Sequence, residues 1–157
     1  DSPLKSFAAT LSCPQRVAAR MPIPVTGYAQ VGISGVAKVQ VWISPKGSEP
    51  ADDPHFATAR WRDATILDPP QQGAWGCGLP DESIPEGTTG CGADGEPLTW
   101  PMRLCKLHWA ILLPGLAPGE YTLRSRTIDE NGYAQPQPRP FRKSGHAAIE
   151  TVRVVVE

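Results

Sequence analysis

Three cysteines and one histidine are the residues of this sequence whose types and spacing could do chemistry together. Cys77, Cys91 and Cys105 are separated by two gaps of 13 residues, and His108 lies three positions after the last of them. Three thiolates and an imidazole are a ligand set that zinc accepts. The closely spaced ligand pairs of a zinc knuckle are missing, however, and positions 105 and 108 point to opposite faces of a strand. A metal site is therefore the least favoured of three interpretations.

The favoured interpretation is a disulfide between Cys77 and Cys91, and free buried thiols are the second. With Cys13 the chain has four cysteines, and their pairing is not fixed by the sequence. A bridge from Cys77 to Cys91 would close a long loop and stabilise the fold by restricting the unfolded chain. Because structural disulfides form in oxidising compartments, this bridge would also indicate a periplasmic or exported protein. Without the bridge, the location is open.

Adjacent carboxylates are the other groups that could act together, as a general acid and a general base. Asp52 and Asp53 form one such pair, and Asp81 and Glu82 form another, both in segments typical of loops. Solvated side chains are the favoured interpretation there. The sequence has no Gly-x-Ser-x-Gly elbow, no His-Glu-x-x-His and no phosphate-binding glycine loop. We therefore expect no catalytic residue, cofactor-binding residue or metal ligand in this chain.

Charge and hydropathy give no reason to expect nucleic acid or a membrane as a partner. The formal net charge is -1, and no run of about 18 apolar residues could span a bilayer. The first residues lack the basic, apolar and small-residue order of a signal peptide. We therefore expect a soluble chain that is either a mature protein or a piece of a longer one.

Two arginines stand on one face of the segment "YTLRSRTIDENGYAQP", residues 121–136. Alternation along an extended chain puts Arg124 and Arg126 together, and the strand is expected to end near Ile128. A solvated strand face is favoured over an ion-pair or partner role for these arginines. The next residues favour a turn, so Asp129 and Asn131 are expected to form that turn rather than to act as acid and base.

The elements that must position these residues are short strands. The chain has 157 residues, enough for one domain, and its 18 prolines and 15 glycines leave little room for helices. Residues 1–21 are expected to be an irregular lead-in, and residues 68–101 a long inserted loop. Strands without intervening helices predict an all-β sandwich. The expected strands cover residues 25–29, 36–43, 60–67, 104–113, 121–128 and 148–156.

The strand at residues 36–43 has the clearest alternation. It is expected to turn Ala37, Val39, Val41 and Ile43 toward the core and Trp42 outward. An outward indole is a candidate interface anchor. The alternative is that the lead-in or the long loop covers Trp42.

Five fragments follow one another along the chain: "VTGYAQVGISGVAKVQVWIS", "WRDATIL", "LHWAILL", "LAPGEYTLRSRTIDENGYAQP" and "IETVRVVV". The most specific is a strand of the form L-x-x-R-x-x-D followed by a polar turn and Gln-Pro, and it contains Leu123, Arg126, Asp129 and Gln135. In this order, the five fragments resemble the C-terminal dimerisation domain of the sulfite oxidase family of molybdenum-pterin enzymes. The resemblance implies an immunoglobulin-like antiparallel β-sandwich over residues 25–157, with residues 1–24 leading in from an upstream catalytic domain that the sequence does not include.

The same resemblance implies a function. The chain would be a non-catalytic dimerisation domain that pairs with itself and contacts the catalytic domain of its parent, where molybdopterin-molybdenum is expected. The isolated domain would form a weak dimer. In animal and plant members an arginine before a glycine reaches the substrate pocket; aligning Gly145 with that glycine puts Ser144 in its place, beside Arg142 and Lys143. This departure leaves the parent's substrate open.

Two other functions compete with this one. A free-standing immunoglobulin-like binding module fits the expected fold but not the ordered fragments. A small independent hydrolase is disfavoured because the motifs that would carry its chemistry are absent from the sequence.

Overall fold

The computed structural model describes residues 8–69, 86–92, 95–135 and 147–157. These residues contain nine β-strands and no helix. The strands are β1 (Ala8–Ala9), β2 (Arg16–Val17), β3 (Ile23–Gln30), β4 (Val36–Pro45), β5 (Arg62–Asp63), β6 (Thr65–Ile66), β7 (Leu107–Leu113), β8 (Gly119–Asp129) and β9 (Glu150–Val156).

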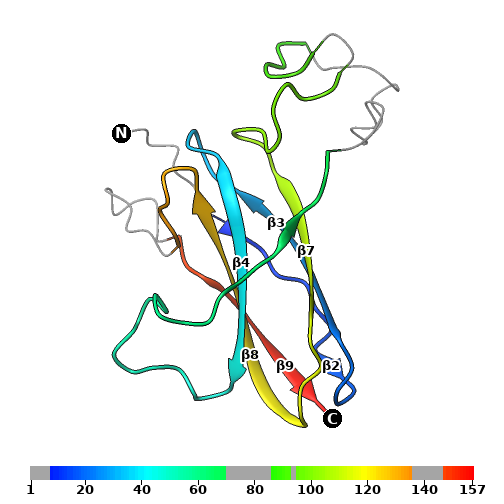
Figure 1. Cartoon of the computed structure of the whole chain (residues 1–157), viewed down its shortest axis with the longest axis vertical. Coiled ribbons are helices and arrows are strands. Elements are labelled where there is room, and N and C mark those ends of the chain that lie inside the picture. Colours follow the sequence, from blue (N-terminus) through cyan, green and yellow to red (C-terminus); the bar gives the residue numbers. More distant parts are fainter. Residues whose placement is uncertain (1–7, 70–85, 93–94, 136–146) are drawn as a thin grey trace.

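The strands form two sheets that pack into a β-sandwich. One sheet has the order β1-β3-β7-β6, and the other has the order β2-β9-β8-β4-β5. Neighbouring strands are antiparallel except for β2 and β9, which are parallel. In Figure 1, β3 and β7 run side by side, as do β8 and β9. The all-β class and the two-sheet arrangement expected from the alternating segments are confirmed.

The core lies between the sheets and is built from alternate residues of the five long strands. Burying one Val, Leu or Ile side chain contributes about 1.5–3 kcal/mol, so these strands supply most of the apolar stabilisation. In β7 and β9 the buried residues alternate with more exposed ones, as expected for strands with one face on the core. The fully or almost fully buried hydrophobic residues of these strands are Ile23, Val25, Ala29, Val36, Val39, Val41, Leu107, Trp109, Leu113, Leu123, Val154 and Val156.

Trp109, the largest buried side chain, depends on a glycine in the neighbouring strand. Gly27 pairs with Trp109 across β3 and β7, so both face the core. A Cβ on Gly27 would lie 2.6 Å from Trp109 Cζ2 and 2.0 Å from the backbone oxygen of Thr10. The indole and the chain after β1 thus occupy the space that any other side chain at position 27 would need.

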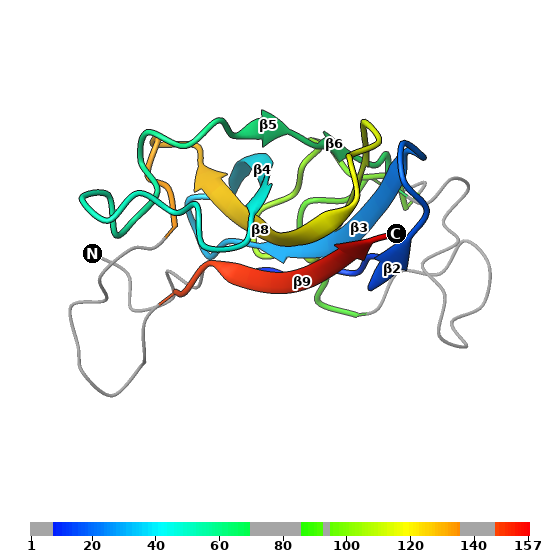
Figure 2. The ribbon, with the colours of Figure 1, turned by 90° about the horizontal axis from the view of Figure 1, so that it is seen from below.

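Two features of the expected strands are wrong in detail. Ala37 is exposed rather than buried, because a β-bulge between Val36 and Lys38 turns Val36 into the core instead. The segment 60–67 is two strands, not one: β5 pairs with β4, and β6 pairs with β7 in the other sheet. Figure 2 shows the chain passing through β5 and β6 along one edge of the sandwich. The segment therefore connects the two sheets.

The described part of the N-terminal segment belongs to the sandwich. β1 pairs with β3, and β2 pairs with β9. Backbone hydrogen bonds also join Ser12 to Thr26 in both directions, at 2.8 and 2.9 Å. Residues 8–21, the described part of the segment expected to be irregular, are thus hydrogen-bonded to both sheets.

The polar turn after β8 forms as predicted. β8 ends at Asp129, one residue beyond the expected end. Oδ1 of Asp129 accepts hydrogen bonds from the backbone N–H groups of Asn131 (3.0 Å) and Tyr133 (2.8 Å), and Gly132 has a φ of 84°. Asp129 is buried within the turn, which confirms its role as a turn former.

Candidate functional site

The outer face of the five-stranded sheet carries a cluster of two arginines and three aromatic side chains, which we call the arginine–aromatic ladder. It consists of Trp42, Phe56, Trp61, Arg124 and Arg126. Trp42 pairs with Arg124 across β4 and β8, and Gln40 pairs with Arg126. Since these positions alternate with core residues, their side chains leave the sheet on its outer side.

The two other aromatic rings come from the connection between β4 and β5, at the lower left of Figure 1. The guanidinium of Arg124 lies 4.8 Å from the ring centroid of Trp42 and 4.7 Å from that of Phe56. The guanidinium of Arg126 lies 4.2 Å from the ring centroid of Trp61. These distances are within the range of cation–π contacts. The connection is therefore fastened to the sheet through both arginines.

Hydrogen bonds complete the surroundings of Arg124. Its guanidinium donates to Glu49 Oε1 (2.5 Å) and to Ser44 Oγ (3.2 Å), and its side chain is only 7% exposed. The expectation that this arginine is solvated is wrong. The reason is that two of its partners, Glu49 and Phe56, come from the β4–β5 connection, which alternation along β8 does not include. The hydrogen bond from Arg124 also holds the pKa of Glu49 below its usual value.

The guanidinium of Arg126 is also hydrogen-bonded to a neighbouring side chain. Nε and Nη2 of Arg126 both donate to Gln40 Oε1, at 2.9 and 2.7 Å, and Nε2 of Gln40 donates to Asp63 Oδ1 at 2.7 Å. Partial burial lowers the pKa of Arg126, and the negative charge of Asp53 acts in the opposite direction. The hydrogen bond from Gln40, followed by that from Lys38, lowers the pKa of Asp63. A relay of polar groups thus joins β8, β4 and β5.

Asp53 fixes the conformation of the connecting segment. Its carboxylate accepts hydrogen bonds from the backbone N–H groups of Ala57 (2.8 Å) and Thr58 (2.7 Å) and from the Thr58 hydroxyl (2.7 Å). The same bonds lower the pKa of Asp53. Phe56 has a φ of 53°, which is uncommon for a bulky residue, and its carbonyl accepts from Trp61 Nε1 at 2.7 Å. The carboxylate of Asp53 is therefore used in a turn.

The candidate interface residue Trp42 is partly buried inside this ladder. Its ring centroid lies 5.3 Å from that of Phe56 and 6.0 Å from that of Trp61. The β4–β5 connection covers Trp42 through these two rings, and this segment was not among the expected sources of cover. Glu49, Phe56 and Trp61 were missed as partners. The sequence did contain a signal for them. Two outward arginines beside an outward indole favour aromatic and acidic side chains as neighbours.

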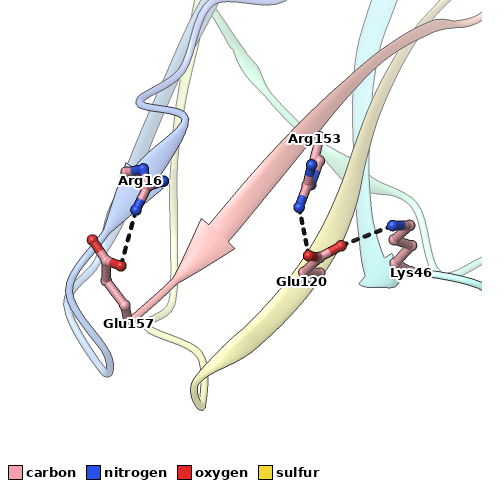
Figure 3. A network of polar contacts seen from close by, with 5 residues as sticks. All are labelled: Arg16, Lys46, Glu120, Arg153 and Glu157. Carbon is pink, nitrogen blue, oxygen red and sulfur yellow. Dashed lines mark hydrogen bonds and ion pairs between the residues drawn. The ribbon is translucent and has the colours of Figure 1, made fainter.

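Exposed ion pairs lie on the same sheet, close to the C-terminus of the chain (Figure 3). Glu120 contacts both Lys46 and Arg153, and Arg16 contacts Glu157. Hydrogen bonds from Lys46 and Arg153 lower the pKa of Glu120. Solvated pairs of this kind add little to stability. They do give this face a mixed, strongly polar character.

The structure describes three of the four cysteines. No two of the described cysteines, Cys13, Cys91 and Cys105, are bonded to each other. Cys77 lies outside the described residues, so its bridge to Cys91 stays a prediction. Burial raises the pKa of both Cys13 and Cys105, and Cys105 Sγ lies 3.0 Å from the Met102 carbonyl oxygen. Within the described ranges, no three His, Cys, Asp or Glu side chains lie close enough to hold a metal ion.

Several expected site residues cannot be placed. Arg142, Lys143 and Ser144, expected near the parent's substrate pocket, lie outside the described residues. The acidic pair Asp81 and Glu82 also lies outside them. Comparison with known proteins adds nothing to the placement: no protein-family model and no curated protein matches this chain. Among the described segments, no helix is long and apolar enough to cross a membrane.

Proposed function

We propose that this chain is a non-catalytic dimerisation domain of a molybdenum-cofactor oxidoreductase resembling sulfite oxidase. The observation that carries the proposal is the structural role of the four residues of its most specific sequence fragment. Leu123 is fully buried in the core, and Arg126 stacks on Trp61. Asp129 is buried in the turn that ends β8. Each of these residues thus has a structural role in the sandwich, as expected for residues that characterise a fold.

Gln135 is the fourth residue of that fragment, and its side chain is almost fully buried. Its Oε1 accepts from the backbone N–H (2.8 Å) and the hydroxyl (3.0 Å) of Thr127. Its Nε2 donates to the Ala148 carbonyl at 2.8 Å. The amide therefore joins the end of β8 to the segment that enters β9. Neither an acid nor an apolar residue would satisfy both sides of this contact.

Strand order supports an immunoglobulin-like form of the sandwich. The order β1-β3-β7-β6 corresponds to the A-B-E-D sheet of that fold, and β9-β8-β4-β5 corresponds to strands G, F, C and C′. Near the start of β8, the Tyr121 hydroxyl donates to the Ala117 carbonyl at 3.0 Å. This contact resembles the tyrosine corner found at the start of strand F. Both features favour the immunoglobulin-like assignment over other two-sheet folds.

In the proposed parent, the redox chemistry belongs to molybdopterin-molybdenum in an upstream catalytic domain. This chain would supply pairing between subunits and contacts to that domain. The described ionisable side chains fit such a role, because Asp53, Glu49 and Arg124 are engaged in holding the β4–β5 connection on the sheet. The substrate of the parent remains open.

The proposal is tested on the protein produced from the full reading frame. We expect that frame to encode a domain with a molybdenum-binding cysteine upstream of Asp1. The purified protein should contain about one molybdenum per polypeptide, whereas the 157-residue chain alone should contain none and should not oxidise sulfite. A full-length protein without molybdenum, or stoichiometric molybdenum in the isolated chain, would refute it.

A free-standing immunoglobulin-like binding module is the second candidate, and the strand order alone favours it. The two candidates differ in what accompanies the domain. A reading frame that carries no molybdenum-binding domain would decide for the binding module.

A further inference from the structure

The outer face of the four-stranded sheet carries no charged side chain along its paired central strands. Its positions follow from the register: Pro24 pairs with Leu112, Thr26 with Ala110, and Tyr28 with His108. Directly paired residues leave an antiparallel sheet on the same side. Thr65 of β6 pairs with Ala110 and extends this surface. We call it the β3–β7 face; its residues are Pro24, Thr26, Tyr28, Thr65, His108, Ala110 and Leu112.

This face is open to solvent at large apolar side chains. Leu112 is 66% exposed and Tyr28 is 37% exposed. Pro24, Thr26 and His108 are exposed as well. None of the seven residues is Asp, Glu, Lys or Arg. Lys106, just before β7, lies at one end of this face, with its Nζ 4.3 Å from the ring centroid of Tyr28. A sheet that presents one face to water normally carries polar and charged residues there, so a face whose paired positions carry no carboxylate, and which has this cation only at one end, is unusual.

The other sheet has the opposite character. Its outer face carries the ion pairs of Glu120, Arg153 and Lys46 and the arginine–aromatic ladder, which the β4–β5 connection already covers. Depletion of charge at the centre, with aromatic and aliphatic side chains present, is the compositional signal of an interface core. By that signal, the β3–β7 face is the better interface of the two.

We propose that the β3–β7 face binds the same face of a second copy of this chain about a two-fold axis. Such an axis brings each patch against itself, so a charged patch would meet its own sign across the axis. The centre of the β3–β7 face carries no charge and avoids that repulsion, and Lys106 lies at one end of the face, away from the axis and so from its own copy in the second chain. Tyr28 and Leu112 are the contact anchors, and Thr26 and Ala110 lie at the centre of the face, nearest the axis.

The extent of the face sets the strength of this contact. Four strands spaced about 4.8 Å apart and seven residues rising about 3.4 Å each would cover at most roughly 450 Å². A stable complex buries about 800 Å² on each partner. The dimer should therefore be weak, as expected for an isolated domain. The inference rests on the proposed dimerisation function and moves the contact from Trp42 to the opposite sheet.

Matched substitutions of two exposed leucines test the surface. Leu112→Asp places a carboxylate on the face, and Leu98→Asp places one in the connection before β7, where the leucine is 72% exposed. Sedimentation equilibrium of the 157-residue chain should show the dissociation constant raised at least about tenfold by Leu112→Asp, because each dimer would bury two carboxylates. Leu98→Asp should change it less than about twofold. Circular dichroism checks that both variants fold.

Cysteine crosslinking tests the geometry with a second matched pair. Thr26→Cys lies at the centre of the β3–β7 face, and Thr151→Cys lies on the outer face of the other sheet. Under mild oxidation, Thr26→Cys should form covalent dimers at least about tenfold faster than Thr151→Cys or the native chain, since thiols held close exchange at high effective concentration.

The outcomes separate this inference from the proposed function. A dimer that is unaffected by Leu112→Asp, with no faster crosslinking at Thr26→Cys, would place the contact on another surface and overturn the inference while dimerisation stands. A chain that stays monomeric at hundreds of micromolar overturns the inference directly. Molybdenum in the full-length protein is measured independently, so its absence would remove the proposed parent and leave the β3–β7 contact intact.

Discussion

Replacing Arg124 should destabilise the domain far more than replacing an exposed arginine on the same sheet. The Arg124 side chain is 7% exposed, pairs with Glu49 and contacts the rings of both Trp42 and Phe56. Arg153 also pairs with a glutamate, Glu120, but its side chain is 61% exposed. The two arginines therefore form a matched pair that differs in burial.

The magnitude follows from what Arg124→Ala leaves behind. Breaking a buried ion pair costs about 3–5 kcal/mol, mainly because the remaining charge is left unpaired. The side chain of Glu49 is 27% exposed and can regain part of its hydration. We therefore expect a loss at the lower end, about 3 kcal/mol, which corresponds to roughly 6–12 °C in the melting temperature for a domain of this size.

Urea unfolding followed by tryptophan fluorescence measures this loss. Arg124→Lys keeps the charge but not the planar stack, so it should lose about half as much free energy of unfolding. Arg153→Ala should lose at most about 1 kcal/mol. If Arg124→Ala and Arg153→Ala had the same small effect, the ladder would not fasten the β4–β5 connection, and the argument from burial would be wrong.

Three further predictions concern backbone space, pH and thiol reactivity. Gly27→Ala should lower the free energy of unfolding by more than about 3 kcal/mol or prevent folding, because the new Cβ would overlap with the backbone oxygen of Thr10. Gly47 has a positive φ but open space around it, so Gly47→Ala should lower the free energy of unfolding by only about 1 kcal/mol, and thermal melts compare the two variants. The lowered pKa of Glu49 stabilises the folded chain above the usual value of 4.5, and this stabilisation is lost as the pH falls through the lower value of the folded state. In urea titrations below pH 4.5, the free energies of unfolding of the native chain and of Glu49→Gln should therefore become more similar. Cys13 and Cys105, whose thiols have raised pKa values, should alkylate slowly near neutral pH in the native chain and quickly in urea, as peptide mass mapping would show.

The long strands could be predicted because each has enough residues for alternation to be visible. In β8, Leu123 is buried and Arg126 lies on the opposite face, as the pattern requires. The two-residue strands could not be predicted, since a pair such as Arg62–Asp63 has no period of its own. Its place depends on pairing with β4, which is a tertiary contact. The bulge that exposes Ala37 is a similar case.

The site could be predicted only where the signal was local. The turn at Asp129 follows from residues within four positions, and its hydrogen bonds are as expected. The burial of Arg124 depends on Glu49 and Phe56, which are 75 and 68 positions away in the chain. Such distant partners leave no period in the sequence around β8, so the prediction of a solvated arginine failed there.

Self-association is the property that the proposed dimerisation function and the β3–β7 contact share, and sedimentation velocity of the unmodified chain tests it most directly. Runs from about 1 to about 500 µM cover the range expected for a contact below standard size. The weight-average mass should rise with concentration from 16.9 kDa toward twice that value. A constant mass of one chain across the whole range would contradict both.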